Sequence, residues 1–188
     1  MALQKVDLNK AYRLINHGPT LIICASHEGV VDAMSAYWVC PLDYDKITAV
    51  VDSGSFTRSL FEKSGKFGLC VPFFKDTALI ARLGTTSMHS DKNKLAGVEM
   101  FYENGVPLLK ECAVYMVCEI IKDAKNESEF DLFKAKVVAA YADTRVFEGG
   151  HWKFENLDDV LRTSHYVAGG QFYADGAAKF EEKAAIIG

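Results

Sequence analysis

The chain has 188 residues, of which 49% are hydrophobic and 24% are charged. This composition is typical of a globular domain with a substantial core and excludes an intrinsically disordered chain. The formal net charge is −4 without a block of basic residues, which argues against nucleic-acid binding, and the apolar runs are of strand length, which argues against a membrane span.

The first predicted element is a short amphipathic helix over residues 7–17. Its apolar residues recur at helical spacing behind Asp7, which can cap the helix, and Gly18-Pro19 ends it. The opening sequence MALQKVDLNKAYRL contains no uninterrupted apolar stretch followed by a cleavage site. We therefore expect a cytoplasmic protein.

Three apolar strands are predicted next, over residues 20–25, 30–41 and 47–52. The first strand is almost wholly apolar and β-branched, and the sequence His-Glu-Gly after it supplies a turn to the second. After the third strand, the polar run SGSFTR leads into an amphipathic helical segment over residues 59–64. Strand, polar run and helix start therefore meet at one place.

The middle of the chain continues with hairpins and one helix. We expect Gly84 to stop that helix, residues 84–97 to form a polar loop, and residues 123–131 to be a charged connection. A loop as long as 84–97 in a compact domain is more often functional than idle. The predicted elements are a strand over 67–71, a helix over 75–83, short strands over 100–102 and 106–109 around Asn104-Gly105, and a long hairpin of strands over 112–122 and 132–142.

The C-terminal part mixes aromatic residues with glycine pairs. Its predicted pieces are an aromatic loop over 147–152, a short helix over 156–161, an aromatic segment over 164–176 and a final helix over 177–185. Many strands at hairpin spacing with few helices predict a mainly β fold with peripheral helices, a β-barrel. No linker or repeat divides the chain, so we predict a single domain over residues 1–188.

The five cysteines lie in or at the edges of apolar strands, and none of them form a Cys-x-x-Cys pair. We therefore expect reduced, buried thiols, and leave a redox disulfide as an alternative. Cys24 and His27 supply only two ligands, so no metal site is predicted. The cysteines are Cys24, Cys40, Cys70, Cys112 and Cys118.

The polar run SGSFTR allows two interpretations. Hydroxyls at a helix start are usually N-caps, and Arg58 could pair with Glu62 one helical turn later. Alternatively, the free backbone N–H groups, the hydroxyls and the Arg58 guanidinium could bind a phosphate at the positive end of the helix dipole.

A resemblance bears on that choice. The segments PTLIICASHEGVVDAMSAYWVCPLD and AVVDSGSFTRSLFEKSGKFGLCVP resemble the flavin reductase-like, FMN-binding split-barrel family, and within it the flavoredoxin branch. The likeness continues through GTTSMHSDKNKLAG, ECAVYMVCEII and LRTSHYVAGGQFYADG, in the order expected for the family. The resemblance implies an FMN-binding split β-barrel with the FMN near a homodimer interface.

The resemblance also implies which residues bind FMN. A segment along the isoalloxazine corresponds to Asp32, Ala33, Met34, Ser35 and Ala36, and the phosphate-binding segment corresponds to Ser53, Ser55, Thr57 and Arg58. The family commonly has Asn at the position of Asp32. Because an ionised Asp only accepts hydrogen bonds, its contact with the flavin is one alternative, and a solvent-facing turn residue is the other.

The loop over residues 84–97 would lie over the flavin in such a protein. The resemblance implies roles for Ser87, His89 and Lys92, and a cation there would stabilise charge on reduced FMN. A solvated charge run is the alternative for this loop. Among the aromatic residues, we expect Trp38 to lie in the core and Trp152 to lie at a dimer interface or to shield the flavin.

Two functions follow from the resemblance. The first is an enzyme that transfers hydride from NAD(P)H, bound transiently, to FMN, and this step needs no catalytic acid or base from the protein. The second is a flavoredoxin-type electron carrier with permanently bound FMN and a redox partner protein. An interaction module that uses the fold without flavin is a third alternative.

Overall fold

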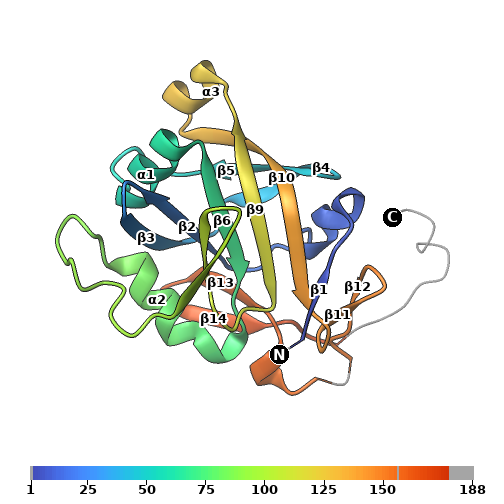
Figure 1. Cartoon of the computed structure of the whole chain (residues 1–188). Helices are drawn as coiled ribbons and strands as arrows, with labels where there is room; N and C mark the ends of the chain where they lie inside the picture. The colour runs from blue at the N-terminus through green and yellow to red at the C-terminus, as the bar shows by residue number, and fades with distance from the viewer. Residues whose placement is uncertain (1, 156, 178–188) are drawn as a thin grey trace.

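The computed structural model describes residues 2–155 and 157–177, and an antiparallel sheet forms its centre (Figure 1). The strand order is β3-β2-β6-β9-β10-β5-β4, and β1 pairs with β10. The predicted mainly β fold with peripheral helices is confirmed. The barrel is not closed, because β3 and β4, the two end strands of the sheet, do not pair with each other. The strands are β1 (Leu3–Lys5), β2 (Leu21–His27), β3 (Val30–Ala36), β4 (Val39–Asp43), β5 (Lys46–Val50), β6 (Lys66–Val71), β7 (Met100–Glu103), β8 (Val106–Leu109), β9 (Val114–Ile121), β10 (Leu132–Asp143), β11 (Phe147–Glu148), β12 (His151–Trp152), β13 (Ser164–Ala168) and β14 (Gln171–Ala174).

The helices are short and lie around the sheet (Figure 1). The predicted N-terminal helix is a 3₁₀ helix, and the predicted charged connection between β9 and β10 contains a short α-helix. The predicted final helix lies almost entirely outside the described residues. The helices are η1 (Leu8–Leu14), α1 (Phe56–Ser64), η2 (Phe74–Asp76), α2 (Thr77–Thr85), α3 (Ala124–Glu129) and η3 (Asp159–Leu161).

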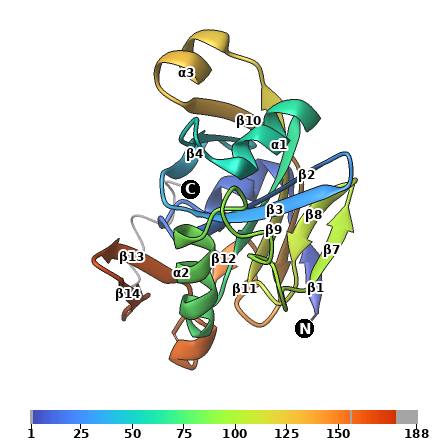
Figure 2. The ribbon, with the colours of Figure 1, turned by 90° about the vertical axis from the view of Figure 1, so that its left-hand side faces the viewer.

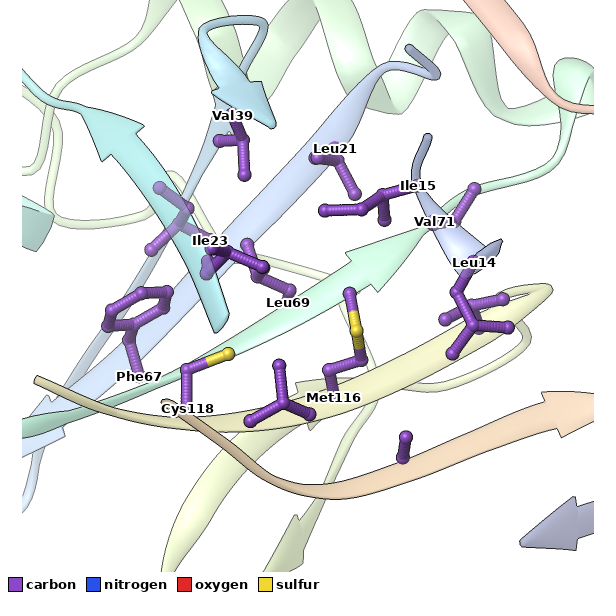
Figure 3. Packing of buried hydrophobic residues seen from close by; sticks show 14 of the residues in the cluster. Leu14, Ile15, Leu21, Ile23, Val39, Phe67, Leu69, Val71, Met116 and Cys118 are labelled. Atoms are coloured by element: carbon purple, nitrogen blue, oxygen red, sulfur yellow. The ribbon is translucent and has the colours of Figure 1, made fainter. Parts of the chain in front are cut away.

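Alternating residues of the central strands build two apolar clusters on opposite faces of the sheet. In β2, Leu21 and Ile23 join the larger cluster, whereas Ile22 and Cys24 join the smaller one. Figure 3 shows the larger cluster, where Leu14 of η1 packs near strand residues such as Val71. This two-residue period is the reason that a nearly continuous apolar run forms a strand buried on both faces.

The β7–β8 hairpin packs on the smaller cluster at a glycine. A Cβ atom on Gly68 of β6 would lie 2.6 Å from both the Leu108 Cδ2 atom and the Pro107 carbonyl oxygen. The hairpin can therefore approach β6 closely because Gly68 has no side chain. The predicted Asn104-Gly105 turn is confirmed, and both residues have positive φ, as a tight hairpin turn requires.

Both α-helices at the sheet edge differ from their predicted bounds. Helix α1 begins at Phe56, so Thr57 and Arg58 lie inside it rather than before it, and Gly65 ends it with φ 73°. Helix α2 continues through Gly84 to Thr85, so the predicted stop at Gly84 is wrong. A helical glycine costs only about 1 kcal/mol relative to alanine, which the packing of α2 on β3 can offset.

The C-terminal part folds into two small hairpins. The predicted aromatic loop is the β11–β12 pair around Gly149-Gly150, and the aromatic segment is the β13–β14 pair around Gly169-Gly170. Within the described ranges, no helix has the length and apolar character needed to span a bilayer.

Candidate functional site

Strand β3 runs between α1 and α2 (Figure 2). Two adjoining depressions are lined by residues of this strand and its neighbours. Their volumes are about 240 and 250 Å³, and they share the lining residues Met34, Ser35 and Asp52. We call the first the polar pocket; its remaining lining residues are Asp32, Gly54, Ser55, Phe56, Thr57, Leu83, Gly84, Thr85, Thr86, Ser87 and Lys94. We call the second the aromatic pocket; its remaining lining residues are Ala36, Tyr37, Trp38, Val50, Val51 and Asp131.

Strand β3 supplies the common wall of both pockets. It pairs with β2 alone in the described part of the chain, so its other edge keeps backbone donors and acceptors free for a ligand. Its side chains alternate: the Met34 sulfur accepts a 3.0 Å hydrogen bond from Ser55 of the α1 N-cap, whereas the Ser35 hydroxyl donates to the Ile80 carbonyl of α2 at 2.6 Å. Ala33 is fully buried.

The start of α1 forms one wall of the polar pocket. Ser55 is its N-cap and accepts a bond from the Arg58 N–H at 3.5 Å, so the predicted capping role is confirmed. The N–H groups of Phe56 and Thr57, in the first helical turn, precede any acceptor within the helix and carry the positive end of its dipole. Ser53 is exposed in the turn before the helix.

A buried ion pair forms the floor of the polar pocket. Asp32 is fully buried and Lys94 is 3% exposed, with the Lys94 Nζ atom 3.1 Å from Asp32 Oδ1. Asp32 Oδ2 accepts hydrogen bonds from the Thr57 hydroxyl at 2.6 Å and from Lys94 Nζ at 3.3 Å. Oδ1 lies within ion-pair distance of Nζ but accepts no hydrogen bond from the described residues. Asp32 is therefore not the solvent-facing turn residue that was one alternative.

Arg58 lines neither pocket and is buried, although its partners Val51 and Asp131 line the aromatic pocket. Its guanidinium donates to the Val51 carbonyl at 2.8 Å and to Glu62 at 2.9 Å, and it also bonds to Asp131. These two carboxylates raise the pKa of Arg58 against the opposing effect of burial. The Arg58–Glu62 alternative is thus confirmed as a contact, and a phosphate role for Arg58 stays a prediction.

Of the three residues predicted to bind FMN from the loop after α2, only one lines the polar pocket. Ser87 lines the polar pocket, while His89 and Lys92 are exposed and contact Phe56 from outside. The His89 ring meets the Phe56 ring edge-on at 5.1 Å, and Lys92 Nζ lies 5.1 Å over the same ring while donating to the Met88 carbonyl at 2.6 Å.

Sequence reasoning missed Lys94 and the threonines at the end of α2. Lys94 is only two residues from Lys92, and nothing local distinguishes the buried lysine from the exposed one. Thr85 and Thr86 were missed because the helix was expected to stop at Gly84. Helix α2 extends to Thr85, with Thr86 as its C-cap, and both threonines line the polar pocket.

Trp38 is 74% exposed, so its predicted place in the core is wrong. It lies between β3 and β4, where the chain leaves one strand before it enters the next. Beside it, the Tyr37 ring stacks on Tyr166 of β13 at 4.6 Å. Burial, and then the neighbouring Tyr166, raise the pKa of Tyr37. The aromatic pocket therefore has large exposed rings on its rim.

Trp152 packs within its own chain. Its ring stacks on Phe154 at 4.9 Å, and its Nε1 atom donates to the Arg13 carbonyl at 3.0 Å.

Four of the five thiols are buried as expected, and burial raises the pKa of Cys24 well above its usual value. Cys40 is the exception, because it lies on the edge strand β4 and is exposed.

Comparisons with known proteins agree with this geometry. The model of the flavin reductase like domain matches residues 12–160. The uncharacterized protein YddH of Escherichia coli K12 is 34% identical over 179 residues, which cover 91% of this chain and 94% of YddH. An FMN-binding domain of a flavin reductases-like enzyme from Shewanella baltica OS155 is 41% identical, with a TM-score of 0.93 and 96% and 98% of the two chains covered. Flavoredoxin from Methanosarcina acetivorans shares the fold, with a TM-score of 0.75, 16% identity and coverage of 90% and 91%.

Proposed function

Since the chain belongs to the flavin reductase-like domain family, we propose that it binds FMN and transfers hydride to it from NAD(P)H. The observation that carries this proposal is the pairing of a polar pocket with an aromatic pocket along one open strand edge. An amphipathic ligand with an anionic end and a flat ring would use both.

The polar pocket suits the phosphate of FMN. Helix α1 has nine residues, and its first N–H groups open onto a wall that also carries the Ser87 hydroxyl. The hydroxyls of Ser55 and Thr85 donate to the Met34 sulfur and the Ala81 carbonyl instead. A phosphomonoester has about −1.5 to −2 charges near neutral pH, which the helix dipole, the first N–H groups and the Ser87 hydroxyl favour. Gly54 lines the same pocket and donates its N–H to Asp52 Oδ1 at 2.7 Å, and a Cβ there would lie 3.0 Å from that oxygen.

The aromatic pocket suits the isoalloxazine ring. Apolar side chains of Ala36, Val50 and Val51 line it, and the exposed Trp38 stands at its rim. The backbone N–H and C=O groups on the free edge of β3 can hydrogen-bond to the polar atoms of the ring. Residues 32–36 would therefore bind the flavin through their backbone even where their side chains contact other parts of the protein. Bound FMN would supply the electron-accepting chemistry, so the protein has only to bind and orient it.

The alternative is a flavoredoxin-type electron carrier with a redox partner protein. The fold similarity to flavoredoxin supports it, and hydride transfer needs no acid–base residue whose presence would separate the two functions. We propose a homodimer under both functions. The exposed rings of Trp38 and Tyr166 support an interface beside the aromatic pocket. The cytoplasmic location stays a prediction.

Binding of FMN and of riboflavin, followed by the quenching of flavin fluorescence, tests the cofactor proposal. We expect FMN to bind at least tenfold more tightly than riboflavin, because riboflavin lacks the phosphate. Ser87→Ala should weaken FMN binding about tenfold and leave riboflavin binding unchanged, since a hydrogen bond to a charged group contributes roughly 1.5–3 kcal/mol. Ser128→Ala, on the exposed side of α3, is the matched control. A protein that binds neither flavin contradicts the proposal.

NADH and NADPH oxidation with excess FMN separates the two functions. Steady turnover, with FMN released and replaced, supports the reductase. Retained FMN without nicotinamide oxidation, but with electron exchange with a reduced carrier protein, supports the flavoredoxin-type function instead.

A further inference from the structure

We propose that Asp32 and Lys94 are a charge-compensating pair that sets how strongly the pocket prefers reduced over oxidised FMN. This inference rests on the proposed FMN site. It concerns a residue, Lys94, to which no sequence signal assigns a role, and a pairing that joins β3 to the loop after α2.

The geometry places both charges at the pocket floor. Asp32 and Lys94 line the polar pocket and are 0% and 3% exposed. Lys94 is the only cationic residue among the described residues that line this pocket. The other lining carboxylate, Asp52, is exposed, so water screens it, whereas the buried pair is screened much less.

Holding the loop in place does not by itself require charges. Removing two charges from water is costly, and an apolar pair of similar volume is often neutral or stabilising in its place. Lys94 Nζ lies 3.1 Å from Asp32 Oδ1 and 3.3 Å from Oδ2, so both carboxylate oxygens face the same cation, and both residues line the polar pocket. A buried ion pair among the lining residues of a ligand pocket therefore calls for a reason other than stability alone.

The electrostatic consequence is specific. Reduction adds electron density to the flavin, so an uncompensated cation in the pocket favours the reduced form and an uncompensated anion disfavours it. With both members present, the pair adds almost no net charge. In general, a unit charge about 10 Å from a group that gains an electron, at an effective dielectric constant of about 20, changes the preference for the reduced form about tenfold.

The experiment measures the dissociation constants of oxidised and reduced FMN, the latter under anaerobic conditions, for the same variants. Asp32→Asn, which leaves Lys94 uncompensated, should raise the ratio of reduced to oxidised affinity about tenfold, an upward shift of about 30 mV for two electrons. Lys94→Met should lower the ratio about tenfold. The double variant Asp32→Asn/Lys94→Gln keeps a polar contact without net charge and should return within threefold of the wild type.

The controls are Asp91→Asn, in the same loop but exposed, and Lys63→Met, on the exposed side of α1. Both should leave the ratio unchanged. If the single variants lower thermal stability but do not move the ratio, the pair is only a structural contact and the inference is wrong. If oxidised and reduced affinities change together, and riboflavin affinity does not change, the pair acts on the phosphate, and this also overturns the inference.

Should Asp32→Asn not retain FMN, Lys94→Met and the double variant decide the matter, because recovery of the ratio in the double variant is required. A wild-type protein without FMN affinity overturns the proposed function and this inference together. FMN binding with an unmoved ratio overturns the inference alone.

Discussion

The guanidinium of Arg58 is enclosed by groups of its own chain. It bonds to Asp131, Glu62 and the Val51 carbonyl, and its Cζ atom lies 4.8 Å over the Phe133 ring. The contact with Glu62 lies within α1, whereas the others connect α1 to Val51, before the helix, and to Asp131 and Phe133, at the entry of β10. Arg58 therefore ties the first helix to the far side of the sheet.

We expect Arg58→Met to lower the free energy of unfolding by about 3 kcal/mol, because it leaves the carboxylates around it without their cation. Urea unfolding measures the loss, and Lys63→Met on the exposed side of α1 is the control. FMN affinity of the folded variant then tests the phosphate role. Unchanged stability with affinity reduced tenfold or more would make Arg58 a ligand after all.

At the level of single residues, the sequence predicted what local chemistry decides. Ser55 caps a helix because a serine before an amphipathic run does so in most sequences. The partners of Arg58 and Asp32 were not predictable in this way, since Asp131 and Lys94 lie 73 and 62 positions away along the chain. From the sequence alone, a guanidinium beside hydroxyls is compatible both with phosphate binding and with a structural ion pair.

At the level of elements, the β7–β8 hairpin depends on Gly68. We expect Gly68→Ala to destabilise the protein by about 2–3 kcal/mol, because its Cβ would lie 2.6 Å from the Pro107 carbonyl oxygen, a backbone atom that cannot move aside alone. Thermal unfolding measures the effect. Gly176→Ala, where a Cβ would meet nothing within 4 Å, should change stability little. Equal stability of both variants would contradict this packing.

The C-terminal β13–β14 hairpin is held to the N-terminal segment through His17. The His17 Nε2 atom lies 3.0 Å from the Thr163 hydroxyl, and His165 of β13 bonds to Asp175 at 2.9 Å. Burial lowers the pKa of His17 to about 4, against the opposing effect of Asp175, and the nearby His165 lowers it further. The folded protein therefore favours the neutral form of the His17 imidazole.

Because the unfolded chain binds this proton near pH 6.5, it holds more protons than the folded chain between pH 6.5 and about 4. We expect the contribution of His17 to stability to be complete above pH 6.5 and to fall by roughly 3 kcal/mol by pH 4. Urea unfolding at several pH values measures the slope. His17→Gln should flatten it over this range, and an equal slope in the variant would show that another group titrates.

The elements followed from the sequence where periodicity was strong. The long β9–β10 hairpin and the Asn104-Gly105 turn were predicted because alternation and turn chemistry are local. Packing decided the rest. Helix α2 passes through Gly84 because β3 supports it, and the short α3 forms in a charged stretch where Asp123 caps it by accepting from the Asn126 N–H at 3.3 Å.

For the whole molecule, the exposed rings beside the aromatic pocket predict self-association. We expect the protein to be a homodimer in solution and Trp38→Glu to shift it to a monomer, because a charge would be buried in the interface. Light scattering after size-exclusion chromatography measures the mass. Tyr102→Glu, at another exposed ring, on β7, is the control and should remain dimeric. A wild-type monomer would contradict the interface.

The sheet ends at two strands, and they are protected differently. The edge of β4 carries Pro41, which cannot donate to another strand, whereas β3, with the sequence VVDAMSA, has no proline. A cofactor lying along β3 would cover that edge. Chains synthesised faster than flavin is supplied would keep a template on which foreign strands can add, so riboflavin availability during expression should govern how much of the protein aggregates.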